Sequence, residues 1–520
     1  MNIRSLIRNK FFLFFCFFIF FFSFFFNKKY ADLGVFPIDT FLHFDSALGI
    51  LNGKIPVRDY WVVSGLAVDY LQSFFFLLFG VSWNSYTLHS SLFNGLLSVT
   101  TFFYLNIRGL SIFLSFIYSI FFSVLAYPIS GVPFLDFHAV FFCLLAFYLI
   151  SISFYVKKPK FIWCFVSFFL FISFLSKQVP VAYFVLILFF LSPIYLKYKD
   201  DYSPFFFISI STLIYALFIC IYFFFYEISF KDFYYQYIQH PLTIGNSRLE
   251  NLEIKISTFF NKFKFILIPL FLNIILILNK IKKKNFEDFF SFLVFLALVL
   301  CLLYYQILTK NQILIYFLTT LSFAILHIEI HKKDFVLKKT FSTLTLFFVL
   351  FVTLKYHYEF NEKRKFHDLQ HANLKASISA GLIDSRLDGL MWLTTEYNDP
   401  IKEIEILRLV KNKILASEKK IFLVSHYKFL DSVTNNKIYY LARSYTIDNA
   451  SFPINNNLSF EKYKKYLVNL IKKKNIDEIY FIKTEKIDFA VISNYFDKKC
   501  YEILFDEIFM KIKMNIECLN

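Results

Sequence analysis

Long hydrophobic runs alternate with short polar segments over the first 356 residues. A membrane-spanning helix needs about 20 mostly apolar residues, and on this template the chain contains about eleven spans. They centre on residues 11–26, 86–105, 110–127, 137–156, 161–176, 179–196, 204–226, 263–279, 289–307, 312–329 and 340–356. The pattern predicts an α-helical protein that crosses a membrane many times.

The composition supports the same class. Of the 520 residues, 58% are hydrophobic and 78 are phenylalanine, and the mean hydropathy of +0.55 is typical of membrane proteins rather than soluble domains. The formal net charge of +17 would ordinarily suggest nucleic-acid binding, but the lysines gather in short clusters between hydrophobic runs. Such clusters orient membrane proteins, so we expect no nucleic-acid partner.

The basic clusters predict the orientation of the chain. If the N-terminus lies in the cytoplasm, nearly every cluster between spans falls in a cytoplasmic loop, as the positive-inside rule requires. These clusters contain Arg108, Lys157, Lys158, Lys160, Lys197, Lys199, Lys280, Lys282 to Lys284, Lys332, Lys333, Lys338 and Lys339. The first span follows Arg4, Arg8 and Lys10 and has no small-residue cleavage site after it, so we expect a retained anchor. An odd number of spans then places a first loop, 27–85, and the tail outside the cytoplasm.

The tail, 357–520, changes in composition and predicts a separate domain. Short apolar runs such as "KKIFLVSHY" (419–427) and "DEIYFIK" (477–483) alternate with helical patterns such as "SFEKYKKYLVNLIKKK" (459–474). This alternation is typical of a small α/β domain. We therefore expect a transmembrane domain over 1–356 and an extracytoplasmic α/β domain after it, with the lysines of 459–474 on a solvated helix face.

The seven cysteines fall into two groups. Five lie in apolar runs and are expected to be buried, whereas Cys500 and Cys518 lie in the tail and pair if that domain faces an oxidising compartment. No CxxC or CxxH spacing occurs, so we expect neither a metal site nor a metal cofactor.

The first loop carries unusual chemistry for a connection between spans. Its segment "PIDTFLHFDSALGIL" (37–51) has helical spacing that places Asp39, His43 and Ala47 on one face, while Asp45 points elsewhere. Asp39 and His43 are thus expected to meet one partner together. Gly53 and Pro56 end this helix, and an aromatic, amphipathic segment suited to the membrane interface follows. Loops that only connect are usually short, so we expect this loop to have a function.

The loop resembles the first outer loop of the GT-C glycosyltransferases, polytopic enzymes that use lipid-phosphate-linked sugars. The resemblance rests on Asp39-x-x-x-His43-x-x-x-Ala47 followed by "ILNGKIPVRDYW", "SGL" and "LLFGVSW". It is greatest to the bacterial branch related to protein mannosyltransferases and the aminoarabinose transferase of lipid A, and it covers about the first 180 residues. It implies a GT-C-like membrane domain, a polyprenyl-phosphate sugar as donor, and a lipid, glycan or protein as acceptor.

The resemblance also implies particular site residues. In the family, an acidic residue eight positions before a small residue of this loop is the catalytic base, and Asp39 occupies that position. A second acidic residue opens a later outer turn, which Asp136 matches in "YPISGVPFLDFHAVFF" (127–142). The Lys-Gln found at the outer end of a later span is similar to Lys177 and Gln178 in "FLSKQVP".

One departure from the family concerns the donor phosphate. The relatives nearest the aminoarabinose transferase carry a basic residue before Pro-Pro where this chain has Ser64-Gly65-Leu66. The phosphate contact is therefore expected from another cation, either Lys54, Arg58 or Lys177. Asp59 joins the candidate substrate-binding residues, together with His43.

The residue types suit the chemistry without the resemblance. Transfer from a polyprenyl phosphate needs the acceptor hydroxyl deprotonated as it attacks the anomeric carbon, which a carboxylate can do. The departing phosphate needs cations, which Arg and Lys supply. One base and one displacement would invert the anomeric centre.

Structural alternatives exist for these residues. Asp39 follows Pro37 and Asp136 opens a span, so both could be helix N-caps. His43 could make a structural hydrogen bond, while Asp45, Asp59 and Asp69 could stabilise the loop, Asp59 by pairing with Arg58.

The sequence leaves three other functions open for the whole chain: a coupled transporter, a polysaccharide polymerase or ligase of the cell envelope, and a structural scaffold. A coupled transporter needs ionisable residues inside the bilayer, and the middles of these spans hold almost none.

The predicted orientation has a direct test. Reporter fusions after residue 360 should behave as extracytoplasmic, and fusions in the basic loop near Lys199 as cytoplasmic, because the lysine clusters hold their loops inside. A cytoplasmic signal at residue 360 would overturn the orientation.

Overall fold

The computed structural model is mainly helical and divides into two compact units. It describes residues 10–156, 159–252, 255–278, 286–309, 315–332, 336–397, 399–440, 442–446, 449–454 and 457–519. The first unit contains Met1–Ala31, Thr87–Ile219 and Leu252–His371. The second contains Asp32–Tyr86, Cys220–Asn251 and Ala372–Asn520. The units thus alternate along the chain, whereas the predicted domains 1–356 and 357–520 divide the sequence once.

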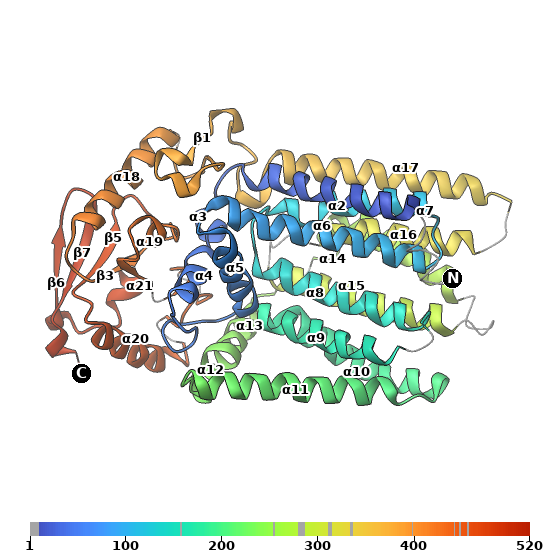
Figure 1. Ribbon diagram of the computed structural model, residues 1–520, viewed down its shortest axis with the longest axis horizontal. Helices are drawn as coiled ribbons and strands as arrows, with labels where there is room; N and C mark the ends of the chain where they lie inside the picture. Colours follow the sequence, from blue (N-terminus) through green and yellow to red (C-terminus); the bar gives the residue numbers. More distant parts are fainter. Residues whose placement is uncertain are drawn as a thin grey trace. The chain divides into compact units, whose positions relative to one another are not determined.

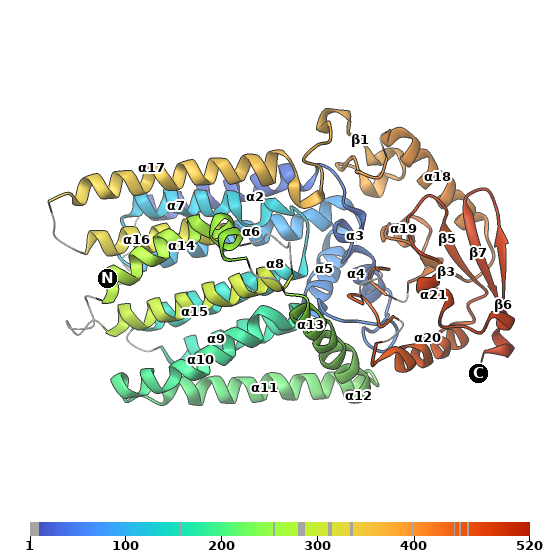
Figure 2. The ribbon, with the colours of Figure 1, turned by 180° about the vertical axis from the view of Figure 1, so that it is seen from behind.

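The first unit is a bundle of long helices that lie side by side (Figures 1 and 2). Its helices, some of which continue into the second unit, are α2 (Lys10–Ala31), α6 (Trp83–Ile107), α7 (Ile112–Leu125), α8 (Leu135–Ser153), α9 (Lys160–Ser176), α10 (Gln178–Lys199), α11 (Ser203–Phe225), α14 (Ile256–Leu278), α15 (Phe286–Leu308), α16 (Phe317–His331) and α17 (Lys338–Tyr356). Each of the eleven predicted spans overlaps one of these helices.

Eight helices in the described part of the chain are long and apolar enough to cross a membrane. They are α2, α7 with the turn after it, α8, α10, α11, α14, α15 and α17 with the turns after it. Helices α9 and α16 are apolar but shorter than 18 residues, and α6 is not among the eight. The class of a polytopic helical membrane protein is therefore supported, and the count of eleven spans stays a prediction.

The helices of the bundle differ in how much of each is buried. The most apolar window of α8 is 89% buried and that of α15 is 72% buried, whereas that of α11 is only 6% buried. Small residues bring α8 and α9 together, because Ser173 Oγ donates to the carbonyl oxygen of Ala139 at 2.7 Å and lies 3.2 Å from Cys143 Sγ. Helices α8 and α15 thus form the interior, and α11 presents its side chains outward.

Charged residues of the bundle meet at helix ends. Lys332 Nζ lies 2.6 Å from Asp288 Oδ2, Arg108 Nη2 lies 3.5 Å from Asp288 Oδ1, and Arg108 also donates to Ser291 Oγ at 2.6 Å. Arg108 and Lys332 belong to the basic clusters that predict orientation. Other members of those clusters lie outside the described residues, namely Arg4, Arg8, Lys157, Lys158, Lys280, Lys282 to Lys284 and Lys333.

The second unit contains a five-stranded sheet in the order β4-β3-β5-β7-β6. The strands are β3 (Ile421–Val424), β4 (Ile438–Tyr439), β5 (Glu478–Ile482), β6 (Tyr501–Phe505) and β7 (Phe509–Met514). Strand β3 pairs in parallel with β4 and β5, while β7 runs antiparallel to β5 and β6. The parallel strand β3 is buried throughout, as its "IFLV" sequence requires.

The remaining elements of the second unit are helices and a short hairpin. They are α3 (Pro37–Thr40), α4 (Phe44–Leu51), α5 (Leu66–Phe79), α12 (Phe230–Phe233), the π-helix Tyr234–Gln239, α13 (His240–Glu250), β1 (Ile378–Ser379), β2 (Met391–Trp392), α18 (Pro400–Ala416), α19 (Leu430–Val433), α20 (Phe460–Lys474) and α21 (Ala490–Ser493). The small sheet region predicted for the tail is confirmed: its predicted strands coincide with β3 and β5, and its predicted helix with α20.

Backbone hydrogen bonds join the first loop to the tail. Gly34 N donates to the carbonyl oxygen of Met391 at 3.0 Å, and Val35 N donates to that of Leu393 at 2.8 Å. The first loop therefore folds as part of the same unit as the C-terminal sheet.

The prediction of one helix over 37–51 is wrong. Helix α3 ends at Thr40, and α4 begins at Phe44. Between them, the Phe41 ring is fully buried and packs 4.9 Å from the ring centre of Phe429 and 5.8 Å from that of Trp83. This packing overrides the helical periodicity, so Asp39 and His43 do not lie on one face of a single helix.

The predicted disulfide is confirmed. Cys500 and Cys518 are bonded to each other, with their Cα atoms 5.2 Å apart. The bond ties the start of β6 to the segment that follows β7, and so it closes the outer edge of the sheet.

Candidate functional site

Neither predicted catalytic carboxylate is a helix N-cap. Helix α3 follows Phe36, and helix α8 follows Phe134; neither N-terminus has a side-chain cap. Asp39 lies inside the first turn of α3 and is partly exposed, and Asp136 lies inside the first turn of α8. The capping alternative that the sequence left open therefore does not explain either residue.

His43, which the sequence analysis names as a candidate substrate-binding residue, contacts a buried carboxylate of its own unit. His43 Nδ1 lies 2.7 Å from Asp69 Oδ1, and both side chains are fully buried. Asp69 also pairs with the guanidinium of Arg443, whose side chain is 8% exposed. The three residues come from α4's N-terminal turn, α5 and the segment after β4, so this contact holds three parts of the second unit together.

Gly65 provides the space for this contact. Its φ of +83° is unfavourable for any residue with a side chain, and a Cβ there would collide with Arg443 Nη1 and lie 2.9 Å from His43 Cε1. The GT-C relatives that this loop resembles carry a basic residue before Pro-Pro at this place. This chain has Gly65 there, which leaves space for Arg443 from the tail.

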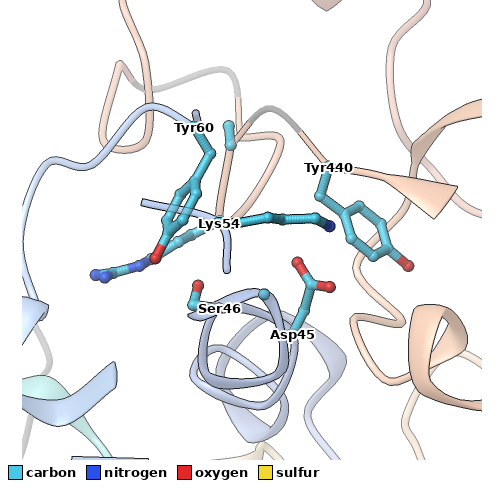
Figure 3. A pocket seen from close by; sticks show the side chains of 8 residues that line it. Asp45, Ser46, Lys54, Tyr60 and Tyr440 are labelled. Atoms are coloured by element: carbon cyan, nitrogen blue, oxygen red, sulfur yellow. The ribbon is translucent and has the colours of Figure 1, made fainter. Parts of the chain in front are cut away.

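A small pocket lies beside this contact, between the first loop and the segment after β4 (Figure 3). Its walls include Asp45, Ser46, Lys54, Tyr60, Tyr440 and Arg443. The carboxylate of Asp45 and the ammonium of Lys54 point toward each other near the ring of Tyr440 (Figure 3). The cavity volume is about 10 Å³, which is about enough for one water molecule. The pocket therefore admits a single polar atom of a ligand rather than a whole glycan.

More charged residues surround the pocket. Lys54 Nζ lies 3.5 Å from Asp431 Oδ2, and Asp431 Oδ1 accepts a hydrogen bond from Ile438 N at 3.0 Å. Lys428 Nζ donates to the carbonyl oxygen of Ala442 at 2.9 Å and lies 3.8 Å from the centre of the Tyr440 ring. Two lysines and two aspartates, counting Asp45, are therefore concentrated in one largely buried cluster.

Burial moves the pKa values of two members of this cluster toward neutrality. It raises the pKa of Asp45 to about 7, with nearby Lys54 opposing the rise. It lowers the pKa of Lys428 to about 7, with Asp45 opposing the fall. A carboxylate whose pKa lies near the working pH is well matched to proton transfer.

Several buried polar atoms of the pocket are unsatisfied. Asp45 Oδ1, the Tyr60 hydroxyl, and Arg443 Nε and Nη1 have no hydrogen-bond partner within the described part of the chain. Buried polar atoms are nearly always hydrogen-bonded. Their arrangement around a pocket therefore indicates a place for water or for a polar group of a ligand.

Arg58 and Asp59 pair with each other, as the structural alternative proposes. Arg58 Nη2 lies 2.8 Å from Asp59 Oδ2, which also accepts a hydrogen bond from Ile55 N at 2.9 Å. Arg58 Nη1 donates to the carbonyl oxygen of Tyr226 at 3.0 Å. Neither residue lines the Asp45 pocket; Arg58 lines a separate groove.

In the first unit, two motifs that are far apart in the sequence meet. Lys177 Nζ lies 2.6 Å from Asp136 Oδ1, and it also lies 5.3 Å from the centre of the Tyr305 ring. Gln178 is the next residue and opens α10. The structure therefore brings together two of the predicted site residues, Asp136 and Lys177.

Sequence reasoning missed Arg443, Tyr440, Lys428 and Asp431, and it assigned Asp45 and Asp69 only structural roles. These residues lie in segments without a recognisable motif. Within the described ranges, no group of three or more His, Cys, Asp or Glu residues is placed to hold a metal ion.

Comparison with known proteins adds no family. No protein family model matches the chain, and no curated protein is significantly similar to it. The GT-C resemblance therefore rests on the residues quoted above.

The pKa of Asp45 predicts how stability depends on pH. Because burial raises this pKa from 3.8 to about 7, the folded chain holds a proton that the unfolded chain releases between about pH 4 and pH 7. Asp45 therefore favours folding less as the pH rises through that window. Asp45→Asn removes this effect, so the Tm of the variant relative to wild type should be higher at pH 8 than at pH 5.

Thermal unfolding of the purified proteins at both pH values measures the effect. The matched control is Asp497→Asn, an exposed aspartate of the same unit, whose Tm difference from wild type should not change with pH. A relative Tm for Asp45→Asn that is equal at both pH values, or lower at pH 8, contradicts the assignment.

Proposed function

We propose that this protein is a glycosyltransferase that moves a sugar from a polyprenyl-phosphate donor to a lipid, glycan or protein acceptor. The observation that supports this proposal most directly is the sequence and structure of the first loop. It resembles the GT-C loop in sequence, and it folds with the tail around a buried pocket that holds carboxylate, lysine and arginine side chains. The lysine and arginine side chains of the pocket can neutralise a phosphate, and the motif supplies Asp39, which is not part of the pocket lining, as the carboxylate that deprotonates a hydroxyl.

Asp39 is the proposed general base. It occupies the acidic position of the motif, it is partly exposed, and it does not cap a helix. Asp136, paired with Lys177 at 2.6 Å, is the proposed second acidic residue, with Gln178 beside it. The resemblance assigns both residues to the site, although they come from separate stretches of sequence. Their contact therefore supports the motif.

Lys54 and Arg443 are the proposed contacts of the donor phosphate. Lys54 was one of three candidates from the sequence and lines the pocket, while Arg58 is held by Asp59. Arg443 is a strong addition, because its Nε and Nη1 atoms are unsatisfied within the described residues. An arginine can hold a phosphate by two parallel hydrogen bonds.

The reaction then needs one displacement. The carboxylate of Asp39 accepts the proton of the acceptor hydroxyl as its oxygen attacks the anomeric carbon, and the bond from that carbon to the phosphate oxygen breaks. The anomeric configuration inverts. Phosphate is a good leaving group once cations neutralise its charge, so no general acid and no metal or other cofactor is required.

The proposed location is the outer face of a cytoplasmic membrane. Eight helices suited to spanning support a membrane protein, and the lysine clusters favour an inside N-terminus. The Cys500–Cys518 disulfide supports an extracytoplasmic tail, because disulfides persist in oxidising compartments. Ion pairs of the first unit lie at helix ends, which does not favour a coupled transporter.

Asp39→Asn tests the proposed base. It preserves the size of the side chain and removes the proton acceptor, so transfer from a polyprenyl-phosphate sugar should fall by roughly 10²-fold or more, while folding and membrane insertion persist. Initial rates of transfer by the purified proteins measure the effect. Asp497→Asn serves as the matched control, because Asp497 is exposed and distant in sequence from the first loop.

Asp45→Asn is a second variant rather than a control, because Asp45 lines the pocket. Unchanged transfer in Asp39→Asn rules out Asp39 as the base. Loss in Asp45→Asn alone would move that role to Asp45. Absence of transfer by folded wild-type protein with every donor tested would contradict the proposed function.

A further inference from the structure

A second, larger hollow in the second unit is lined by cations. It is a groove of about 510 Å³ between the first loop, the segment that follows α11, and α20. Its cationic side chains are Arg58, Lys231, Lys462, Lys465 and Lys473, and its carboxylates are Glu227 and Asp232. We call it the cationic groove.

The four lysines of the cationic groove outnumber its two carboxylates, Glu227 and Asp232. None of them forms an ion pair with a described residue, whereas Arg58 is paired with Asp59. Lys462 Nζ lies 3.4 Å from the centre of the Tyr235 ring. Like charges held around one hollow repel each other, so an anion in the groove would relieve that repulsion.

The groove also contains a buried polar atom without a partner. The hydroxyl of Tyr466 is inaccessible to solvent and has no hydrogen-bond partner in the described chain. Its ring lies 5.6 Å from that of Trp61, which fixes it against the first loop. A hydroxyl at such a position can donate to an oxygen of a ligand.

The chain itself indicates that the groove lies at a membrane surface. Glu227 comes just after Phe225, where α11 ends, and α11 has the length and composition of a spanning helix. Phe224, Phe225 and Phe230 beside the groove are 82%, 75% and 58% exposed. Arg58 binds this segment through the carbonyl oxygen of Tyr226.

Helix α5 extends the same apolar surface. Tyr70 of α5 contacts Tyr222 of α11, with ring centres 6.1 Å apart. The helix buries Asp69 and Gln72 and exposes Phe74, Leu77, Leu78 and Phe79. A helix with its polar side buried and its apolar side exposed is suited to lie in the membrane interface.

We infer that the cationic groove binds the phosphate headgroup of an anionic phospholipid. Its lysines supply charge-assisted hydrogen bonds to phosphate oxygens, and the exposed phenylalanines beside it supply an apolar surface for acyl chains. Soluble anionic glycans carry the same charge, but they have no acyl chains that could pack against that apolar surface. The inference does not depend on glycosyl transfer, because the groove and the Asp45 pocket have separate walls.

Native mass spectrometry of the full-length protein in a neutral detergent tests this inference. The probes are phosphatidylglycerol, phosphatidylcholine, glycerol phosphate and polyprenyl phosphate. Wild type should retain phosphatidylglycerol in preference to phosphatidylcholine. In Lys462→Gln/Lys465→Gln, the tightest phosphatidylglycerol should bind about tenfold more weakly or worse, because each lysine near the membrane surface contributes to attraction.

The matched control is Lys464→Gln/Lys472→Gln. It removes the same charge from the same helix at positions that do not line the groove, and its affinity should stay within about twofold of wild type. As a second measurement, phosphatidylglycerol should raise the Tm of wild type and of the control variant, and raise that of the groove variant much less.

Equal weakening in both variants would overturn the inference, since it would show a general charge effect. Competition by glycerol phosphate as strong as that of the lipid would assign the groove to a soluble anion instead. Retention of polyprenyl phosphate without retention of phosphatidylglycerol would assign it to the sugar donor, and this outcome also contradicts the inference.

Discussion

The buried carboxylate of Asp69 is the constraint on which the second unit depends. An isolated charge in a protein interior costs several kcal/mol, and Asp69 is stabilised only because His43 and Arg443 both contact it. Asp69 and Arg443 are 374 residues apart in the chain. The first loop therefore cannot reach its structure independently of the tail, and the backbone hydrogen bonds from Gly34 and Val35 to the segment after β2 reinforce the same dependence.

This constraint explains the pocket beside it. Arg443, held by Asp69, lines the pocket together with Asp45, Lys54 and Tyr60, and its Nε and Nη1 atoms are buried without a hydrogen-bond partner among the described residues. Asp45 is then buried with two lysines nearby, and burial brings its pKa to about 7. Such an arrangement is costly for folding, and groups of perturbed pKa in a pocket are typical of functional sites. The same burial that destabilises Asp45 thus makes its proton available near neutral pH.

Much of the fold followed from local pattern. The long apolar helices were predictable because a continuous apolar run of about 20 residues favours a helix over other structures, and β3, β5 and α20 were predictable from their periodicity. Two features of the structure were not predictable from the local sequence. Phe41 interrupts the predicted helix because it packs against Phe429 and Trp83, and Arg443 enters the site from a segment with no motif. The contact of Asp136 with Lys177 was partly predictable. Both residues were candidates from the sequence, but only the packing of α8 and α10 brings them together.

The most direct measurement of the central claim is turnover of a polyprenyl-phosphate sugar by purified wild-type protein. The sugar product and the released polyprenyl phosphate are followed together, and the anomeric configuration of the product is determined by NMR. The account predicts one polyprenyl phosphate released for each sugar transferred, with inversion of configuration. Retention of configuration, or transfer of a sugar phosphate with release of free polyprenol in place of polyprenyl phosphate, would contradict it.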